Sequence, residues 1–366
     1  MDRRTFLTTT ATGMAIAATG TAHASTASVV EIAEPLPLRP DARMLRAGLS
    51  VAFTAAYFAD IAQRFGNVVA QLSGGRLGLE FANHQISAGE PSDAGRADIW
   101  FCRADELSVV DGAFSYFSGL PMDYGLSAEW HDAWLGAAGG QLFWDELGAE
   151  HGLKPLSIGH TGASPGAWTT TDWVAPRDIT STRAAASGLA AAVLRRAGAE
   201  VTALPPSAQV SALATGEISF AEPGLPKVAA IAAGFGAGNS ARHLRTGIAS
   251  SGSVLACCVR TGIWTELDGA EQTILTSAAA VIARETAAET AAHQALVAPH
   301  LGRSRNIAQA MMAEDVRRAL NGAATGIVAE LAARSAATRH LHDAYFGFRT
   351  AATGLPDPLS AAAGIA

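Results

Sequence analysis

The chain has 366 residues, 49% of them apolar and 16% charged, a composition typical of a protein long enough to form two lobes with separate cores. Its formal net charge is −7, and only Lys154 and Lys227 are lysines among its 26 basic residues. Because no basic stripe is available to neutralise phosphates, nucleic acid is not expected as a partner.

Residues 1–24 have the features of an export signal. Arg3 and Arg4 precede Thr5-Phe6-Leu7 in a twin-arginine pattern, and an Ala22-His23-Ala24 cleavage-type site follows a short apolar run. That run is far shorter than the roughly 20 residues that a membrane-spanning helix needs. The sequence therefore predicts export to the periplasm by the twin-arginine pathway, with residues 25–40 as a flexible leader.

Strands and helices alternate in the first part of the mature chain. Residues 46–52 read as a strand, 57–72 carry apolar residues at helical spacing, and a Ser-Gly-Gly-Arg turn leads to a strand over 77–81. Residues 97–102 form a further apolar run that predicts a strand. Cys102 belongs to it, and we expect this cysteine, Cys257 and Cys258 to be buried free thiols, since adjacent cysteines rarely satisfy disulfide geometry.

The same alternation continues to a helical C-terminus. A helix over 142–151 and an apolar strand over 156–158 precede a glycine-rich turn, and long helical patterns cover 267–290, 311–334 and 338–349. Alternating elements of this kind indicate α/β lobes with mainly parallel sheets. In such folds a ligand binds at the carboxyl ends of strands, in the crevice between lobes.

Several short phrases also resemble a known family. They are Trp144-Asp145-Glu146-Leu147, Gly152-Leu153-Lys154-Pro155, His160-Thr161-Gly162, Val193-Leu194-Arg195-Arg196-Ala197-Gly198, Leu213-Ala214-Thr215-Gly216-Glu217-Ile218 and Tyr345-Phe346-Gly347-Phe348-Arg349. In this order they resemble the solute-binding subunit of tripartite ATP-independent periplasmic (TRAP) transporters, in the branch that binds 2-oxo acids and other small carboxylates.

The resemblance implies an α/β, two-lobe periplasmic binding protein of type II-like fold, with hinge strands and a long C-terminal helical region. The hinge is expected near residues 156–159 and 220–224. The expected division is 41–156 with 224–252 as lobe I, 157–223 with 253–320 as lobe II, and 321–366 as C-terminal helices.

At the binding positions the sequence departs from the family. Ala185 stands where members usually have an arginine that pairs with the substrate carboxylate, and Arg183 could compensate only if the backbone shifts. Glu222 matches one of two acids that hold a cation in relatives, but Ser250 replaces the other. Ser164 stands where relatives tend to have a contacting glutamine. A bridging metal is therefore not expected, and no cofactor is implied.

What remains is a pocket of small and hydroxyl-bearing residues with aromatic walls, which suits a neutral or weakly polar ligand better than a dianion. Loss of both arginine and cation is expected to weaken acid binding by at least ~10- to 100-fold. The expected ligand-binding residues are Trp100, Ser164, Trp168, Arg183, Ala185, Glu222 and Ser250, with Phe101, Ser187 and Ser251 as further candidates.

Other motifs are weaker. Residues 162–166 match the G-x-S-x-G elbow of serine hydrolases, but Pro165 and the strand-like run after it do not supply the required helix. The glycines of 234–238 lack the spacing of a dinucleotide loop. The histidines are scattered, so we expect them at the surface, with only His160 near the crevice.

Three hypotheses follow. The leading one is a TRAP-type binding protein that captures a small organic solute without catalysis and docks on TRAP membrane subunits. The second is a diverged member that acts as a periplasmic sensor or scaffold, and the third, more remote, is a serine hydrolase using Ser164. The sequence leaves open whether the C-terminal helices form a homodimer.

Overall fold

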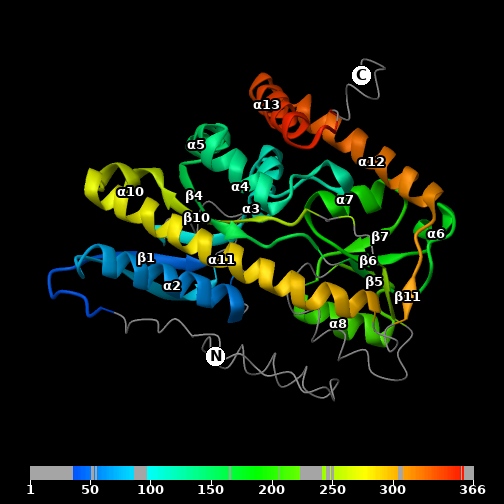
Figure 1. Cartoon of the computed structure of the whole chain (residues 1–366), viewed down its shortest axis with the longest axis horizontal. Coiled ribbons are helices and arrows are strands. Elements are labelled where there is room, and N and C mark those ends of the chain that lie inside the picture. The colour runs from blue at the N-terminus through cyan, green and yellow to red at the C-terminus, as the bar shows by residue number, and fades with distance from the viewer. Residues whose placement is uncertain are drawn as a thin grey trace.

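The computed structural model describes residues 36–50, 53, 56–85, 97–164, 166–204, 206–222, 241–244, 248, 251–303, 308–355 and 357. The expected signal segment and most of the expected leader lie outside these residues. The described chain forms two sheets, each covered by helices, as the sequence predicts (Figure 1). Mainly parallel sheets were expected, but both sheets mix parallel and antiparallel strand pairs.

The first sheet has the strand order β2-β1-β3-β10-β4. β1 runs parallel to both β2 and β3, whereas β10 is antiparallel to β3 and β4. The carboxyl ends of β1 and β3 therefore lie at one edge of the sheet. The strands are β1 (Arg43–Leu49), β2 (Leu77–Gln85), β3 (Ile99–Arg103), β4 (Leu153–His160) and β10 (Val254–Arg260).

Helices cover both faces of this sheet. On one face α2 (Ala56–Leu72), which confirms the predicted helix, and α11 (Gly269–Arg303) pack on buried apolar side chains. α2 buries Phe58, Ile61 and Phe65, whose spacing places them on one side of the helix. The other face is covered by α3 (Ala104–Leu107), η3 (Gly112–Phe117), α4 (Ala128–Ala137) and α5 (Gly140–Glu150).

The interior strand β10 contributes to both cores. Cys257 belongs to the core beneath α2 and α11, while Cys258 belongs to the core on the opposite face. Cys102 lies beside Cys258, with 4.0 Å between the two sulfur atoms. All three cysteines are free and buried, which confirms the prediction.

The second sheet has the order β11-β9-β5-β8-β6-β7. β6 is parallel to its neighbours β7 and β8, and β5 is antiparallel to β8 and β9. Its strands are β5 (Ala167–Thr169), β6 (Arg183–Ala185), β7 (Glu200–Thr202), β8 (Phe220–Ala221), β9 (Arg242–Leu244) and β11 (Gln309–Ala310), and its helices are α6 (Arg177–Thr180), α7 (Gly188–Arg196) and α8 (Pro206–Thr215).

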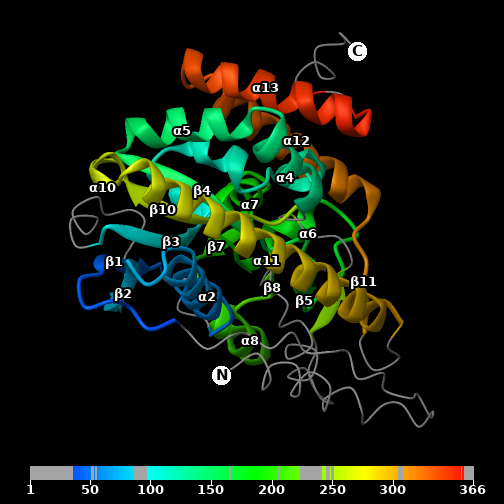
Figure 2. The same ribbon diagram turned by 60° about the vertical axis from the view of Figure 1, so that its left-hand side comes forward.

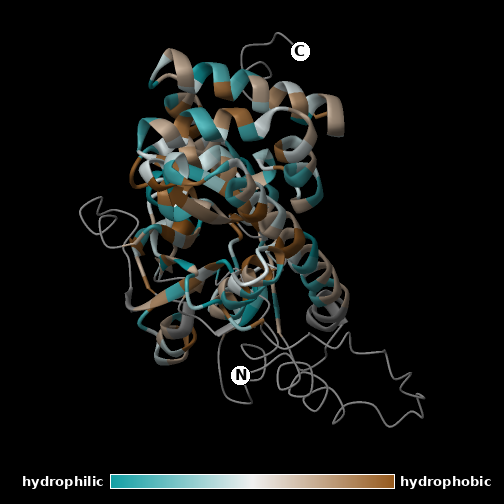
Figure 3. Cartoon of the chain, turned by 90° about the vertical axis from the view of Figure 1, so that its left-hand side faces the viewer, coloured by the Kyte–Doolittle hydropathy of each residue, from teal (hydrophilic) through white to brown (hydrophobic). Residues whose placement is uncertain are grey.

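Long C-terminal helices link the two lobes. α11 has 35 residues and at 1.5 Å per residue is about 52 Å long, so it extends from the first sheet towards β11 of the second (Figures 1 and 2). α12 (Glu314–Ala332) packs beside α7, and α13 (Ala336–Thr353) returns to α4 and η3. Hydrophilic and hydrophobic residues alternate along α13 in Figure 3, as expected for a helix that buries one side.

The pairing of the strands corrects the lobe division expected from the sequence. Residues 253–320 were assigned to lobe II, but β10 is an interior strand of the first sheet, and β9, assigned to lobe I, belongs to the second. The expected hinge at 220–224 is also displaced, because β8 and β9 share one sheet and the crossing follows β9. Short apolar strands carry no local signal of which sheet they join, and only the tertiary hydrogen bonds decide this.

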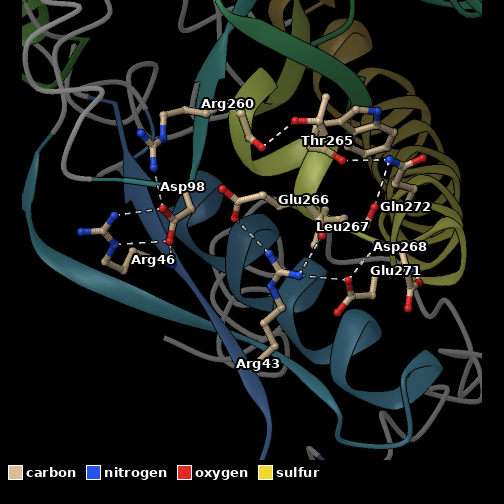
Figure 4. A network of polar contacts seen from close by, with 12 residues as sticks. Arg43, Arg46, Asp98, Arg260, Thr265, Glu266, Leu267, Asp268, Glu271 and Gln272 are labelled. Carbon is tan, nitrogen blue, oxygen red and sulfur yellow. Dashed lines mark hydrogen bonds and ion pairs between the residues drawn. The ribbon is translucent and has the colours of Figure 1, made fainter.

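An ion-pair network stabilises the first sheet at a position distant from the second sheet. Asp98, just before β3, accepts hydrogen bonds from Arg46 Nη2 at 3.0 Å and from Arg260 Nη2 at 2.9 Å (Figure 4). Burial of Asp98 acts against ionisation, but the hydrogen bonds from Arg46 and Arg260 prevail and lower the pKa of Asp98 to about 2. This carboxylate therefore holds β1, β3 and β10 together.

Candidate functional site

The carboxyl ends of strands from both sheets meet at one place. Arg103 is the last residue of β3, and α3 begins directly after it. In the second sheet β6 ends at Ala185, and α7 begins at Gly188. A Cβ atom built on Gly188 would lie 4.0 Å from Cβ of Asp105, so the start of α7 lies close to α3 across the two lobes.

A cluster of polar side chains occupies the first-sheet side of this junction. Arg103 Nε donates to Asp105 Oδ1 at 2.8 Å, and its Nη2 donates to Asp105 Oδ2. Glu106 Oε2 accepts from the backbone N of Arg103 at 2.8 Å and from Ser50 Oγ at 2.7 Å. We call Ser50, Arg103, Asp105 and Glu106 the junction cluster.

The junction cluster is mostly removed from water but remains accessible. The side chains of Arg103 and Asp105 are each 18% exposed to solvent. Among the described residues, no hydrogen bond is formed by Nη1 of Arg103. Burial, followed by the charge of Asp105, raises the pKa of Glu106. The cluster thus offers one guanidinium and two carboxyl groups at the point where the lobes meet.

Two chain crossings between the lobes lie beside the cluster. The segments after β4 and before β10 pair through Thr161 N to Ser253 O at 2.9 Å and Ser253 N to Thr161 Oγ1 at 2.9 Å. Ser253 Oγ also accepts from Asp105 N at 3.4 Å. A rotation of one lobe against the other would bend these segments next to Asp105, which couples the site to any hinge motion.

A segment between η3 and α4 packs against the same crossings. Met122 N donates to Ile248 O at 2.7 Å, and Ser251 Oγ donates to Leu120 O at 3.1 Å. Met122 has φ +57°, a left-handed conformation that is unusual for a residue with a side chain, and this side chain is buried in the core of the second lobe. The segment therefore links the first lobe to the core of the second.

The residues predicted from the second lobe lie mostly in its core or on its surface. Trp168 and Ala185 are buried together beneath α8. Arg183 is exposed, and its guanidinium donates to Gly216 O at 2.6 Å. Glu222 Oε2 accepts from Ile248 N at 2.7 Å, which ties the residue after β8 to the crossing segment.

The remaining predicted residues do not gather into one pocket either. Ser164 Oγ donates to Gly166 O at 3.1 Å in a local turn, and no helix follows the serine. Trp100 and Phe101 are buried in the two cores of the first sheet. Ser187 is exposed at the start of α7, and Ser250 lies outside the described residues.

The junction cluster itself was missed by the sequence reasoning. The available signal was the change from the apolar strand over 97–102 to the charged run Arg103-Ala104-Asp105-Glu106. Charged side chains directly after a buried parallel strand lie at the edge where ligands bind in α/β folds. The family comparison drew attention to Ala185 and Glu222 instead.

The prediction of surface histidines was wrong for several positions. His131 and His160 are buried with their rings 5.5 Å apart, and His243 and His342 are buried as well. His160 Nδ1 accepts from Gly162 N at 2.9 Å. Burial lowers the pKa of His160 to about 4, and burial together with His160 lowers that of His131. Histidine spacing alone does not reveal such a tertiary pair.

Two kinds of feature are absent from the described residues. In this part of the chain, no three His, Cys, Asp or Glu side chains are placed to hold a metal ion. Likewise, no helix within the described ranges has the length and apolar character needed to span a membrane.

The chain matches no protein-family model and no curated protein sequence. Solved structures nevertheless resemble it over most of its length. A TRAP periplasmic solute-binding protein from Pseudoalteromonas atlantica, with bound sodium and pyruvate, has 20% identity and a TM-score of 0.75, covering 86% of this chain and 95% of its own. One from Colwellia psychrerythraea, with calcium and pyruvate, has 19% identity and a TM-score of 0.76, covering 86% and 96%.

A third similar structure carries a different ligand. It is a TRAP periplasmic solute-binding protein from Chromohalobacter salexigens with bound (S)-(+)-2-amino-1-propanol, at 16% identity and a TM-score of 0.67, covering 85% of this chain and 96% of its own. The chain described here thus has the two-lobe fold of TRAP periplasmic solute-binding proteins. This agrees with the fold expected from the sequence resemblance.

Proposed function

We propose that the protein is a solute-binding protein of a TRAP-type transporter, which captures a small organic solute between its lobes. The observation that carries the proposal is the meeting of the carboxyl ends of β3 and β6 at a charged cluster, within a fold shared with TRAP solute-binding proteins over 86% of the chain. Ligand binding to both lobes would supply the free energy of closure.

The proposed work of the protein is binding and delivery without catalysis. Ser164, the only nucleophile that the sequence analysis singled out, uses its hydroxyl in a local turn. We place the protein in the periplasm, exported through the twin-arginine signal at Arg3 and Arg4, and propose docking on TRAP membrane subunits. A homodimer through the C-terminal helices is a further proposal, which a measured mass decides.

We propose that the ligand contacts Arg103 and Asp105 first, since their side chains are accessible at the lobe junction. Lobe I then comprises the first sheet with α2, and lobe II comprises the second sheet with α7 and α8. The crossings after β4 and before β10 form the hinge together with α11.

Native mass spectrometry of the mature protein, purified gently from the periplasm, tests this function. We expect a retained small-molecule adduct, or one gained on incubation with a mixture of small organic solutes. A protein that stays empty in both conditions contradicts solute capture and favours the sensor or scaffold role. The same spectra give the oligomeric mass.

A further inference from the structure

The charges of the junction cluster are unequal. Arg103 supplies one positive charge, whereas Asp105 and Glu106 supply two carboxyl groups, and these two are the acidic side chains that act most strongly on Arg103. Asp105 already neutralises the guanidinium through a two-point ion pair. An incoming anion must therefore compete with Asp105 and face a second carboxyl group at close range.

The geometry leaves both acceptors and a donor able to form further hydrogen bonds. Each oxygen of the Asp105 carboxylate accepts one bond from Arg103, and a carboxylate oxygen has lone pairs for a second. An ammonium group has three N–H donors that fit such positions. Nη1 of Arg103 remains able to donate to an oxygen of the same solute, because no described residue accepts from it.

On this basis we propose that the solute is a small organic compound carrying a primary ammonium group, with Asp105 as its ammonium partner and Arg103 as donor to a neighbouring oxygen. The inference rests on the proposed solute-binding function. The bound 2-amino-1-propanol in the similar structure from Chromohalobacter salexigens shows that this fold accommodates an amino alcohol.

Four three-carbon probes separate the chemistry. Isothermal titration of the mature full-length chain is carried out with (S)-2-amino-1-propanol, L-alanine, L-lactate and 1,2-propanediol. They combine, in turn, ammonium with hydroxyl, ammonium with carboxylate, hydroxyl with carboxylate, and two hydroxyls. We expect the amino alcohol or alanine, or both, to bind at least about 10-fold more tightly than lactate and the diol, since a hydrogen bond to a charged group is worth about 1.5–3 kcal/mol.

Comparing the affinities of the two ammonium probes, 2-amino-1-propanol and L-alanine, identifies the kind of oxygen to which Arg103 donates. Tighter binding of alanine indicates an amino acid, and tighter binding of the amino alcohol indicates an amino alcohol or simple amine. Lactate or propanediol binding as tightly as the ammonium probes refutes the inference but leaves solute capture intact. If none of the four binds, the inference is also refuted, and native mass spectrometry decides separately whether solute capture stands.

Asp105→Asn supplies the residue-level test. This change keeps the shape of the side chain but removes its charge, and it should weaken binding of the preferred ammonium probe by about 10- to 100-fold. Asp145→Asn is the matched control, because Asp145 pairs with Lys154 at 2.5 Å on α5 and β4, away from the junction. Unchanged affinity in a folded Asp105→Asn protein overturns the assignment, and the four-probe titration remains decisive should that variant fail to fold.

Discussion

His160 gives the fold a dependence on pH that can be calculated. Its Nδ1 accepts the backbone N–H of Gly162 at the start of a lobe crossing, so this nitrogen cannot bind a proton without losing the bond. Burial lowers the pKa of His160 to about 4 in the folded protein, against about 6.5 in an unfolded chain. The unfolded state therefore binds more protons between these two values, and stability falls as pH drops through this window.

The magnitude follows from the two pKa values. At 1.36 kcal/mol per pKa unit, the full difference amounts to about 3 kcal/mol below pH 4, and about 2 kcal/mol of it is lost between pH 7.5 and pH 5. His131, whose pKa is also lowered, adds to the loss in the same direction. Stability from His160 is complete above about pH 6.5.

Urea unfolding at pH 7.5 and pH 5 measures the effect, with His160→Gln as the variant. We expect the wild-type protein to lose about 2 kcal/mol more than the variant between these conditions. Replacement of the exposed His340 by glutamine is the control and should leave the wild-type difference unchanged. An equal loss in wild-type and His160→Gln proteins would refute the burial argument.

Three further predictions concern stability and reactivity. Gly159→Ala should destabilise the fold by about 2–4 kcal/mol in urea titrations, because residue 159 has φ +131° and its new Cβ would lie 1.8 Å from Thr286 Oγ1. Gly262→Ala is the control and should have little effect, because its Cβ would meet nothing within 4 Å. Asp98→Asn should lower the free energy of unfolding by about 2 kcal/mol at pH 7. This difference should disappear as pH falls from 3.8 through 2, because the wild-type carboxylate is then protonated. A difference that stays constant with pH would contradict the ion-pair network. A fluorophosphonate probe should not label the protein at Ser164, and labelling that Ser164→Ala abolishes would revive the hydrolase hypothesis.

Much of the architecture was predictable because it depends on local patterns. The apolar spacing of α2 and the sequences of α12 and α13 place those helices close to their observed bounds, and the start of α11 was also close, although α11 continues to residue 303 beyond the expected end at 290. The same applies to the expectation of two α/β lobes and buried free cysteines. These features follow from periodicity and composition, which each segment carries within itself.

The site was less accessible to sequence reasoning because it is assembled from distant segments. Arg183 and Ala185 are neighbours on β6, yet one is exposed on the surface and the other buried in a core. Asp105 lies close to Gly188 across the lobes, a proximity that no local pattern encodes. Position relative to a family motif therefore drew attention to Arg183 and not to Arg103.

The sequence by itself determined which segments are helical and which are apolar strands, since each depends on residues adjacent in the chain. Only the tertiary structure decided that β10 completes the first sheet, that His131 and His160 share a buried site, and that Arg103 and Asp105 stand where the lobes meet. The physical reason is that strand pairing and burial are set by contacts between residues far apart in sequence.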